Sequence, residues 1–259
     1  DYRTKGGVWG RVLRALERWS FRWLDHVILA ERSYRPIVEG AGVPFTVIRN
    51  YARPPDADIG GETEEGGGGG GGPSRLLYTG TVADERGLRT MIDLAATVKR
   101  RGRPERIDIV GVCNRSSQRA AAEARIREQG LDEIVTRVGW DAYVPPSAMT
   151  PYYRRADVGL FLAAPRPNYV GSMPTKFYEY LQCGLPVLCS DVPLWRQFVE
   201  ENDCGAVVPP GDPDAVLDVL TRWREQPALY RRYAENARAA ASRYRWEKMG
   251  TRLVELYRD

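Results

Sequence analysis

The chain has 259 residues, of which 43% are apolar and 28% charged, with a formal net charge of +4. These fractions are those of an ordinary soluble protein. No apolar run reaches membrane-spanning length and no N-terminal stretch reads as a signal peptide, so we expect a cytoplasmic protein. The four cysteines show no CxxC spacing, which favours buried, reduced thiols over a metal site.

The net charge is concentrated at the N-terminus. Residues 1–50 hold nine Lys and Arg against five acids, which accounts for the whole excess. A basic segment of this kind is compatible with an anionic membrane or nucleic acid. The simpler interpretation is a solvated helix face. We favour it and expect no nucleic-acid partner.

Residues 8–24 have the apolar spacing of an amphipathic helix with arginines between the apolar positions. The pattern is compatible with peripheral contact at the inner membrane face, and equally with packing against a partner domain. We favour packing, because the helix leads directly into a predicted strand at 26–30. His26 is the only histidine, and on this apolar segment it indicates a structural role rather than a catalytic one.

The composition changes sharply after a predicted helix at 32–40 and a strand at 45–49. Residues 53–74 contain three prolines, a run of acids and seven consecutive glycines, which is typical of a flexible tether. The glycines neither follow a strand nor open a helix, so they are not a phosphate loop. The sequence therefore predicts an N-terminal part at 1–52, a linker at 53–74 and a main domain at 75–259.

The main domain alternates short apolar strands with helices. We expect strands at 76–79, 107–112, 135–138, 158–163, 186–190 and 206–208, and helices at 88–101, 117–129, 147–155, 174–184, 194–201, 213–224, 227–243 and 246–258. This alternation predicts an α/β domain with a doubly wound parallel sheet. Ligands of such sheets bind outside the carboxyl ends of the strands.

The short helix that opens near Pro174 and closes at Gly184 is the candidate site. Its opening offers free N–H groups and the positive end of a dipole, where an anion binds. Lys176 lies in the first turn, where a cation is unfavourable unless an anion is bound there. One turn further, Glu179 can accept hydrogen bonds from ribose hydroxyls. Together these residues predict a site for a nucleotide diphosphate.

The stretch 174–191, PTKFYEYLQCGLPVLCSD, resembles the donor-site motif of family-4 glycosyltransferases. Four further segments fall in the order of that family: 78–81 with 85–87, 109–111, 138–140 and 153–158. The resemblance covers residues 75–259 well and residues 25–50 weakly. It implies half of the two-domain GT-B fold, namely the Rossmann-like C-terminal domain that holds a nucleotide sugar, with only a remnant of the N-terminal domain.

The resemblance also implies roles for particular residues. The diphosphate would approach backbone N–H groups at Gly80 and Thr81, and Arg86 would neutralise it. The base pocket would be lined by Val138, Gly139 and Trp140. The phosphates would contact Ser172, Thr175 and Lys176, and the ribose would contact Glu179. Sugar transfer in this family requires neither a metal nor another cofactor, so we expect none here. The catalytic residue stays unknown.

Simpler interpretations remain open for four of these residues. Arg86 precedes a glycine and is compatible with an ordinary turn. Trp140 is compatible with a core residue. Glu179 and Lys176 are compatible with solvated charges on a helix surface.

Two features depart from the family. Many relatives carry another glutamate eight residues before the ribose-binding one, and this position is Gly171 here. We therefore expect loop 165–172 to contact the sugar. Nearly all of the acceptor domain is absent, including the segment with the catalytic histidine. The chain is thus either a fragment or one half of a split enzyme with an acceptor-domain partner chain, against which the apolar face of the final helix would pack.

Three functions compete. The first is the donor-binding half of a retaining hexosyltransferase that transfers a sugar to a glycan or glycoconjugate, as in polysaccharide biosynthesis. The second is a nucleotide-sugar-binding module or subunit without independent turnover. The third, a GT-B-type sugar epimerase, is disfavoured because Lys176 and Glu179 match transferases better.

Overall fold

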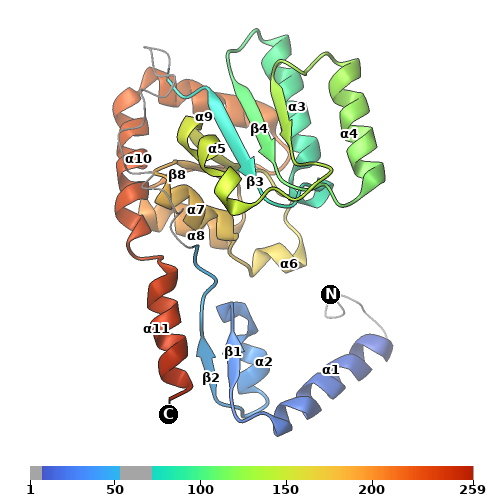
Figure 1. Ribbon diagram of the computed structural model, residues 1–259, viewed down its shortest axis with the longest axis vertical. Coiled ribbons are helices and arrows are strands. Elements are labelled where there is room, and N and C mark those ends of the chain that lie inside the picture. The colour runs from blue at the N-terminus through green and yellow to red at the C-terminus, as the bar shows by residue number, and fades with distance from the viewer. Residues whose placement is uncertain (1–7, 53–71, 259) are drawn as a thin grey trace.

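Two parallel sheets organise the protein in the computed structural model, which describes residues 8–52 and 72–258. In Figure 1 the N-terminal unit lies below the larger unit, and the last helix, α11 (Trp246–Leu256), descends beside it. Most of the predicted linker, residues 53–71, lies outside the described residues, so that prediction stays untested.

The N-terminal unit has a two-stranded parallel sheet over a small apolar core. Its elements are α1 (Val8–Ser20), η2 (Phe21–Trp23), β1 (Val27–Leu29), η3 (Arg32–Tyr34), α2 (Arg35–Glu39) and β2 (Phe45–Val47). His26 Nε2 lies 2.9 Å from Thr46 Oγ1, so the histidine ties β1 to β2 as a structural residue. Trp9 and Trp23 on the N-terminal helices are 79% and 74% exposed.

The larger unit is the predicted doubly wound sheet. Its parallel strands are β3 (Arg75–Thr79), β4 (Arg106–Val110), β5 (Val135–Val138), β6 (Val158–Phe161), β7 (Val187–Ser190) and β8 (Gly205–Val208), in the order β5-β4-β3-β6-β7-β8. From β3 the chain builds outward through β4 and β5, and then returns to β6 and builds the other way. The topological switch point, where such sheets bind ligands, therefore lies between β3 and β6.

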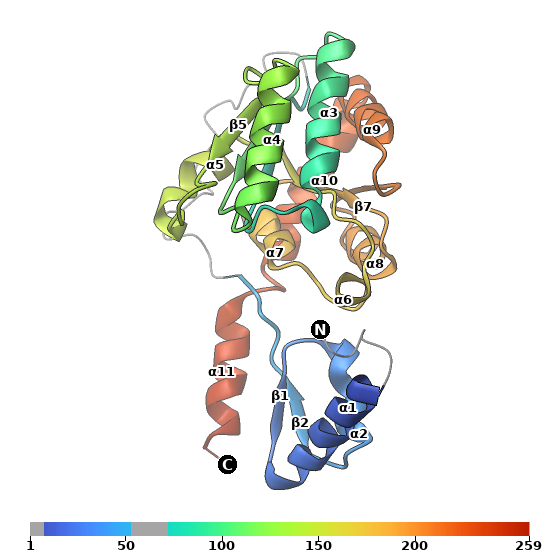
Figure 2. The ribbon, with the colours of Figure 1, turned by 90° about the vertical axis from the view of Figure 1, so that its right-hand side faces the viewer.

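Helices cover both faces of this sheet (Figure 2). They are α3 (Leu88–Arg100), α4 (Ser116–Glu128), α5 (Thr150–Arg155), α6 (Pro167–Val170), α7 (Thr175–Gln182), α8 (Pro193–Asn202), α9 (Pro213–Glu225) and α10 (Pro227–Ala241), with 3-10 turns η4 (Asp84–Arg86) and η5 (Pro146–Ala148). Helix α3 packs against α4 and α9, whereas α7 packs against α10. Helix α6, within the expected loop 165–172, was not predicted.

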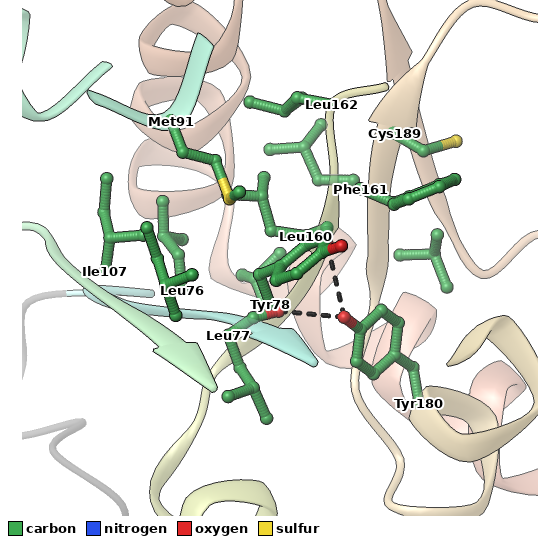
Figure 3. Close-up of a cluster of buried hydrophobic side chains, with 14 of the residues drawn as sticks. Leu76, Leu77, Tyr78, Met91, Ile107, Leu160, Phe161, Leu162, Tyr180 and Cys189 are labelled. Carbon is green, nitrogen blue, oxygen red and sulfur yellow. Dashed lines mark hydrogen bonds between the residues drawn. The ribbon is translucent and has the colours of Figure 1, made fainter. Parts of the chain in front are cut away.

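One buried tyrosine holds α7 against the switch point (Figure 3). Strands β3 and β6 pair only at Leu76 with Val158 and Leu77 with Gly159. The Tyr180 hydroxyl lies 3.1 Å from Leu77 O and 3.2 Å from Leu160 O, and so shares its hydrogen between both strands. A Cβ on Gly159 would lie 2.3 Å from the Tyr180 ring, so only glycine lets the ring sit this close.

The remaining expectations concern thiols, the membrane and the last helix. All four cysteines are buried and free, as predicted. Within residues 8–52 and 72–258, no helix is long and apolar enough to cross a membrane. Helix α11 reaches the N-terminal unit, where the Arg49 N–H lies 3.4 Å from Met249 Sδ.

Candidate functional site

The opening of α7 is free to accept an anion. Pro174 is its N-cap residue, with φ −64° and ψ 127°, and no side chain caps the helix. The helix therefore opens near Pro174, as predicted. The backbone N–H groups of Thr175 and Lys176 donate no hydrogen bond within the described part of the chain. Gly184 adopts φ +66° just past the C-terminus, as predicted.

Lys176 is buried, which contradicts its interpretation as a surface charge. Its side chain is 5% exposed, and its Nζ lies 4.2 Å from the Phe161 ring centroid and 5.0 Å from that of Tyr78. It forms no hydrogen bond or ion pair with the residues that the structure describes. Burial, with a contribution from Arg86, lowers the pKa of Lys176 from 10.5 to about 7. The charge of Glu179 opposes this shift without cancelling it, so the ammonium lacks the directly paired anion that its burial requires.

The Lys176 ammonium faces the loop that follows β3. A Cβ built on Gly80 would lie 3.7 Å from Lys176 Nζ, and Gly80 adopts φ +105°, a conformation that other residues rarely adopt. Two residues that are 96 positions apart in the sequence thus meet at the switch point. The structure brings together the predicted diphosphate residues of the β3 loop and of α7.

Glu179 lies one turn inside α7, at the same edge. Its Oε2 accepts a hydrogen bond from the Tyr153 hydroxyl at 2.7 Å, with Thr79 Oγ1 at 3.5 Å. Burial, followed by the charge of Glu179, raises the pKa of Tyr153, so the tyrosine stays a neutral donor. Glu179 Oε1 makes no hydrogen bond within the described residues, so it is open to another donor. The half-buried carboxylate is held in place and is not a solvated helix acid.

Arg86 and Thr81 line a cavity of about 350 Å³ beside this edge. The Arg86 guanidinium carbon lies 6.0 Å from the ring centroid of Tyr169, which comes from the loop after β6. The cavity brings together loops from three strands. Its other lining residues are Val82, Ala83, Glu85, Asn114, Arg115 and Arg166.

Ser172 and Thr175 border the opening of α7. The Ser172 N–H donates to Tyr169 O at 3.1 Å, and its carbonyl accepts from Trp195 Nε1 at 2.9 Å. The Ser172 backbone is therefore occupied, whereas its hydroxyl makes no hydrogen bond within the described residues. Thr175 is exposed.

The predicted base-pocket residues lie farther out. Val138 ends β5, the edge strand, and is separated from the switch point by β4. The Trp140 ring is 3% exposed and its Nε1 donates to Ile109 O at 3.1 Å, so the ring belongs to the core and does not line a pocket. Gly139 adopts φ +70°, and a Cβ there would overlap the Val144 side chain. The carbonyl groups of Val138, Gly139 and Trp140 each already accept a backbone hydrogen bond, from Gly111, Ala142 and Cys113 in turn.

Sequence reasoning missed several residues at this edge. Tyr153 appeared only as part of a spaced motif, yet it holds Glu179. Asn114 and Arg115 follow the carboxyl end of β4, and that position is the signal that could have identified them. Arg166 and Tyr169 lie in the loop 165–172 that we expected to contact the sugar, although neither residue was singled out there.

The N-terminal unit also reaches the opening of α7. Glu31 Oε1 accepts from the Met173 N–H at 3.1 Å, and Glu31 Oε2 lies 3.4 Å from Arg49. Burial raises the pKa of Glu31, although the Met173 hydrogen bond opposes this shift. A Cβ on Gly171 would lie 2.9 Å from Ser33 Cβ, so glycine permits the close approach of η3.

Solved structures define the class of fold. Sucrose-phosphate synthase from Thermosynechococcus elongatus superimposes with a TM-score of 0.71 at 21% identity, over 96% of this chain and 61% of that chain. HepE from Anabaena, solved with UDP and glucose, gives a TM-score of 0.72 at 17% identity, over 95% of this chain and 66% of that one. The arrangement is that of GT-B glycosyltransferases, as predicted.

The family model described as glycosyl transferases group 1 matches residues 66–240. This is more than half of the chain, which therefore belongs to that family. Alpha-D-kanosaminyltransferase from Streptomyces kanamyceticus is 28% identical over 185 residues, which are 71% of this chain and 45% of that relative. The chain thus spans less than half the length of this relative.

Proposed function

We propose that this chain is the donor-binding half of a retaining glycosyltransferase that moves a sugar from a nucleotide diphosphate to a glycan or glycoconjugate acceptor. The observation that carries the proposal is the buried Lys176, whose ammonium forms no ion pair within the described residues, receives only a partial offset from the charge of Glu179, and faces the β3 loop. A buried cation without a partner destabilises a protein unless a ligand supplies the negative charge. A diphosphate at the opening of α7 would supply it.

The surrounding groups suit the same ligand. Free N–H groups at Thr175 and Lys176 and the guanidinium of Arg86 would bind the diphosphate oxygens. Glu179, fixed by Tyr153, would accept hydrogen bonds from ribose hydroxyls through its open Oε1. The base would then extend over β4 towards the backbone of Gly139 on the edge strand.

These groups would favour transfer by stabilising the leaving group. When the bond between the sugar C1 and the diphosphate oxygen breaks, both bonding electrons stay on the diphosphate. Lys176, Arg86 and the α7 dipole would stabilise that charge without a metal ion. The acceptor hydroxyl would attack C1 from the face that the diphosphate leaves, which retains the configuration. The acceptor proton would pass to the departing diphosphate oxygen, which lies on the same face of the sugar.

Isothermal titration calorimetry with UDP, GDP and ADP tests donor binding. We expect one of them to bind, and Glu179→Ala to weaken that binding while the protein stays folded. HepE was solved with UDP and glucose, so UDP is the first ligand to try. Unchanged affinity in Glu179→Ala would contradict the ribose assignment, and no binding by any of the three would contradict the proposal. Equal affinity with and without EDTA is expected of a metal-free site.

A binding module without independent turnover is the second candidate. The chain covers only 45% of the kanosaminyltransferase relative, which favours a donor half that needs an acceptor half. Release of nucleotide from a bound nucleotide sugar separates the two. If the chain alone binds the nucleotide sugar without releasing nucleotide, and an added acceptor-domain chain restores the release, the protein is one half of a split enzyme.

A further inference from the structure

The cavity beside α7 is strongly basic. Three of its lining residues are arginines, namely Arg86 after β3, Arg115 after β4 and Arg166 after β6, and Glu85 is its single acid. Arg115 pairs with Glu85 at 3.1 Å, which neutralises both side chains. Neither Arg86 nor Arg166 pairs with a carboxylate of the described residues. The half-buried Arg86 and the exposed Arg166 thus form no ion pair within the described residues, and Lys176 approaches Gly80, which directly precedes the lining residue Thr81.

A nucleotide sugar supplies fewer negative charges than these cations could neutralise. Its diphosphate is a diester and carries two negative charges. Lys176 and Arg86, which flank the β3 loop, would balance both. Arg166 would then face the same ligand with no partner. An additional cation in a binding cavity favours a ligand with an additional anionic group.

The position of Arg166 shows which part of the donor would carry this group. Arg166 precedes α6 in the loop after β6, and Tyr169 of the same helix lies beside Arg86. The base would lie towards β5. Arg166 lines the cavity from the β6 loop and therefore lies on the opposite side of the diphosphate. The group attached at that end of the diphosphate is the sugar.

We propose that Arg166 recognises a carboxylate on the transferred sugar, so that the donor is a nucleotide-activated uronic acid. The planar guanidinium pairs with a carboxylate through two parallel hydrogen bonds, and Tyr169 offers an aromatic surface to the sugar ring. This inference rests on the proposed function and specifies its substrate class. Arg166 would be a specificity-determining residue with no part in binding the nucleotide itself.

Titration of the whole chain with UDP, UDP-glucose and UDP-glucuronate tests the proposal. We expect the glucuronate donor to bind about tenfold more tightly than the glucose donor, as a charge-assisted pair permits. Arg166→Gln should abolish that preference and leave the affinity for UDP unchanged, whereas Arg166→Lys should retain part of it. Arg127→Gln, which removes an exposed arginine of α4, is the matched control and should keep the full preference.

Several results would overturn the proposal. Equal affinity of the unmodified chain for the two sugar donors would do so. The proposal would also be overturned if Arg166→Gln lowered the affinity for UDP and for both sugar donors by the same factor, because Arg166 would then belong to the diphosphate site. If UDP does not bind, GDP, GDP-mannose and GDP-mannuronate provide the same comparison. If neither UDP nor GDP binds, ADP with its neutral and uronate sugar donors provides the comparison. Failure of all three nucleoside diphosphates to bind would refute the donor site itself, and this inference with it.

Discussion

Binding of a nucleotide sugar should be coupled to protonation of Lys176. In the empty protein the pKa of Lys176 is about 7, because the ammonium is buried beside Tyr78 and Phe161. A bound diphosphate would return this pKa towards its ordinary value of 10.5. At pH 8 the empty site is then mostly neutral and the occupied site mostly charged. Binding should therefore take up about 0.9 proton per site at this pH.

The same shift sets the pH dependence of affinity. Only the protonated lysine binds the diphosphate well, so the dissociation constant should rise about 25-fold between pH 6.5 and 8.5. A nucleotide sugar is the right ligand, because its diphosphate diester does not titrate in this range. Calorimetry at pH 8 in two buffers with different ionisation enthalpies measures the proton uptake directly.

The control is Lys176→Met, which keeps the apolar stem and removes the titrating group. It should bind more weakly, with an affinity that hardly changes between pH 6.5 and 8.5. In the empty protein the folded-state pKa lies below the unfolded one, so stability should rise as pH increases from about 7 to 10.5. No proton uptake at pH 8, together with a flat affinity profile, would refute the assignment of Lys176 to the diphosphate.

Three further substitutions test the scaffold of the site. Tyr153→Phe removes the hydrogen bond to Glu179, and we expect nucleotide affinity to fall about fivefold with the fold retained. Unchanged affinity in calorimetry would mean that Glu179 does not need this hydrogen bond. Tyr180→Phe leaves the carbonyls of Leu77 and Leu160 without their shared donor and should lower the free energy of unfolding by about 1–2 kcal/mol in urea titrations. Gly159→Ala places a methyl group against the Tyr180 ring and should lower the free energy of unfolding by about 2 kcal/mol or more in the same urea titrations. An unchanged free energy of unfolding would show that α7 can move away from β6.

The fold of the larger unit could be predicted because its local signals agree. Most strands from β3 to β8 are short apolar runs, and α3, α7, α8 and α9 each have an apolar face that is buried against the sheet or a neighbouring helix. The predicted elements therefore match the structure to within a few residues. Helix α6 escaped prediction because its four residues, with two prolines nearby, have no helical periodicity.

The candidate site could be predicted in part for a similar reason. Lys176 and Glu179 lie one turn apart on a single short helix, so their relation is local and can be read from their spacing. The roles of Trp140 and Tyr153 could not be read in this way. An aromatic residue at a strand end fits the core and a pocket equally well, and only the packing of β4 against β5 places the Trp140 ring inside.

By itself, the sequence determined the strand and helix alternation, the parallel sheet and the position of α7 with its short spacing of Lys176 and Glu179, since each depends on residues close together in the chain. Only the tertiary structure decided that Lys176 is buried without a direct ion pair within the described residues, that it faces Gly80, and that Arg166 shares a cavity with Arg86. The physical reason is the strand order. Placing β6 beside β3 brings together loops about 80 residues apart, and no local pattern encodes that distance.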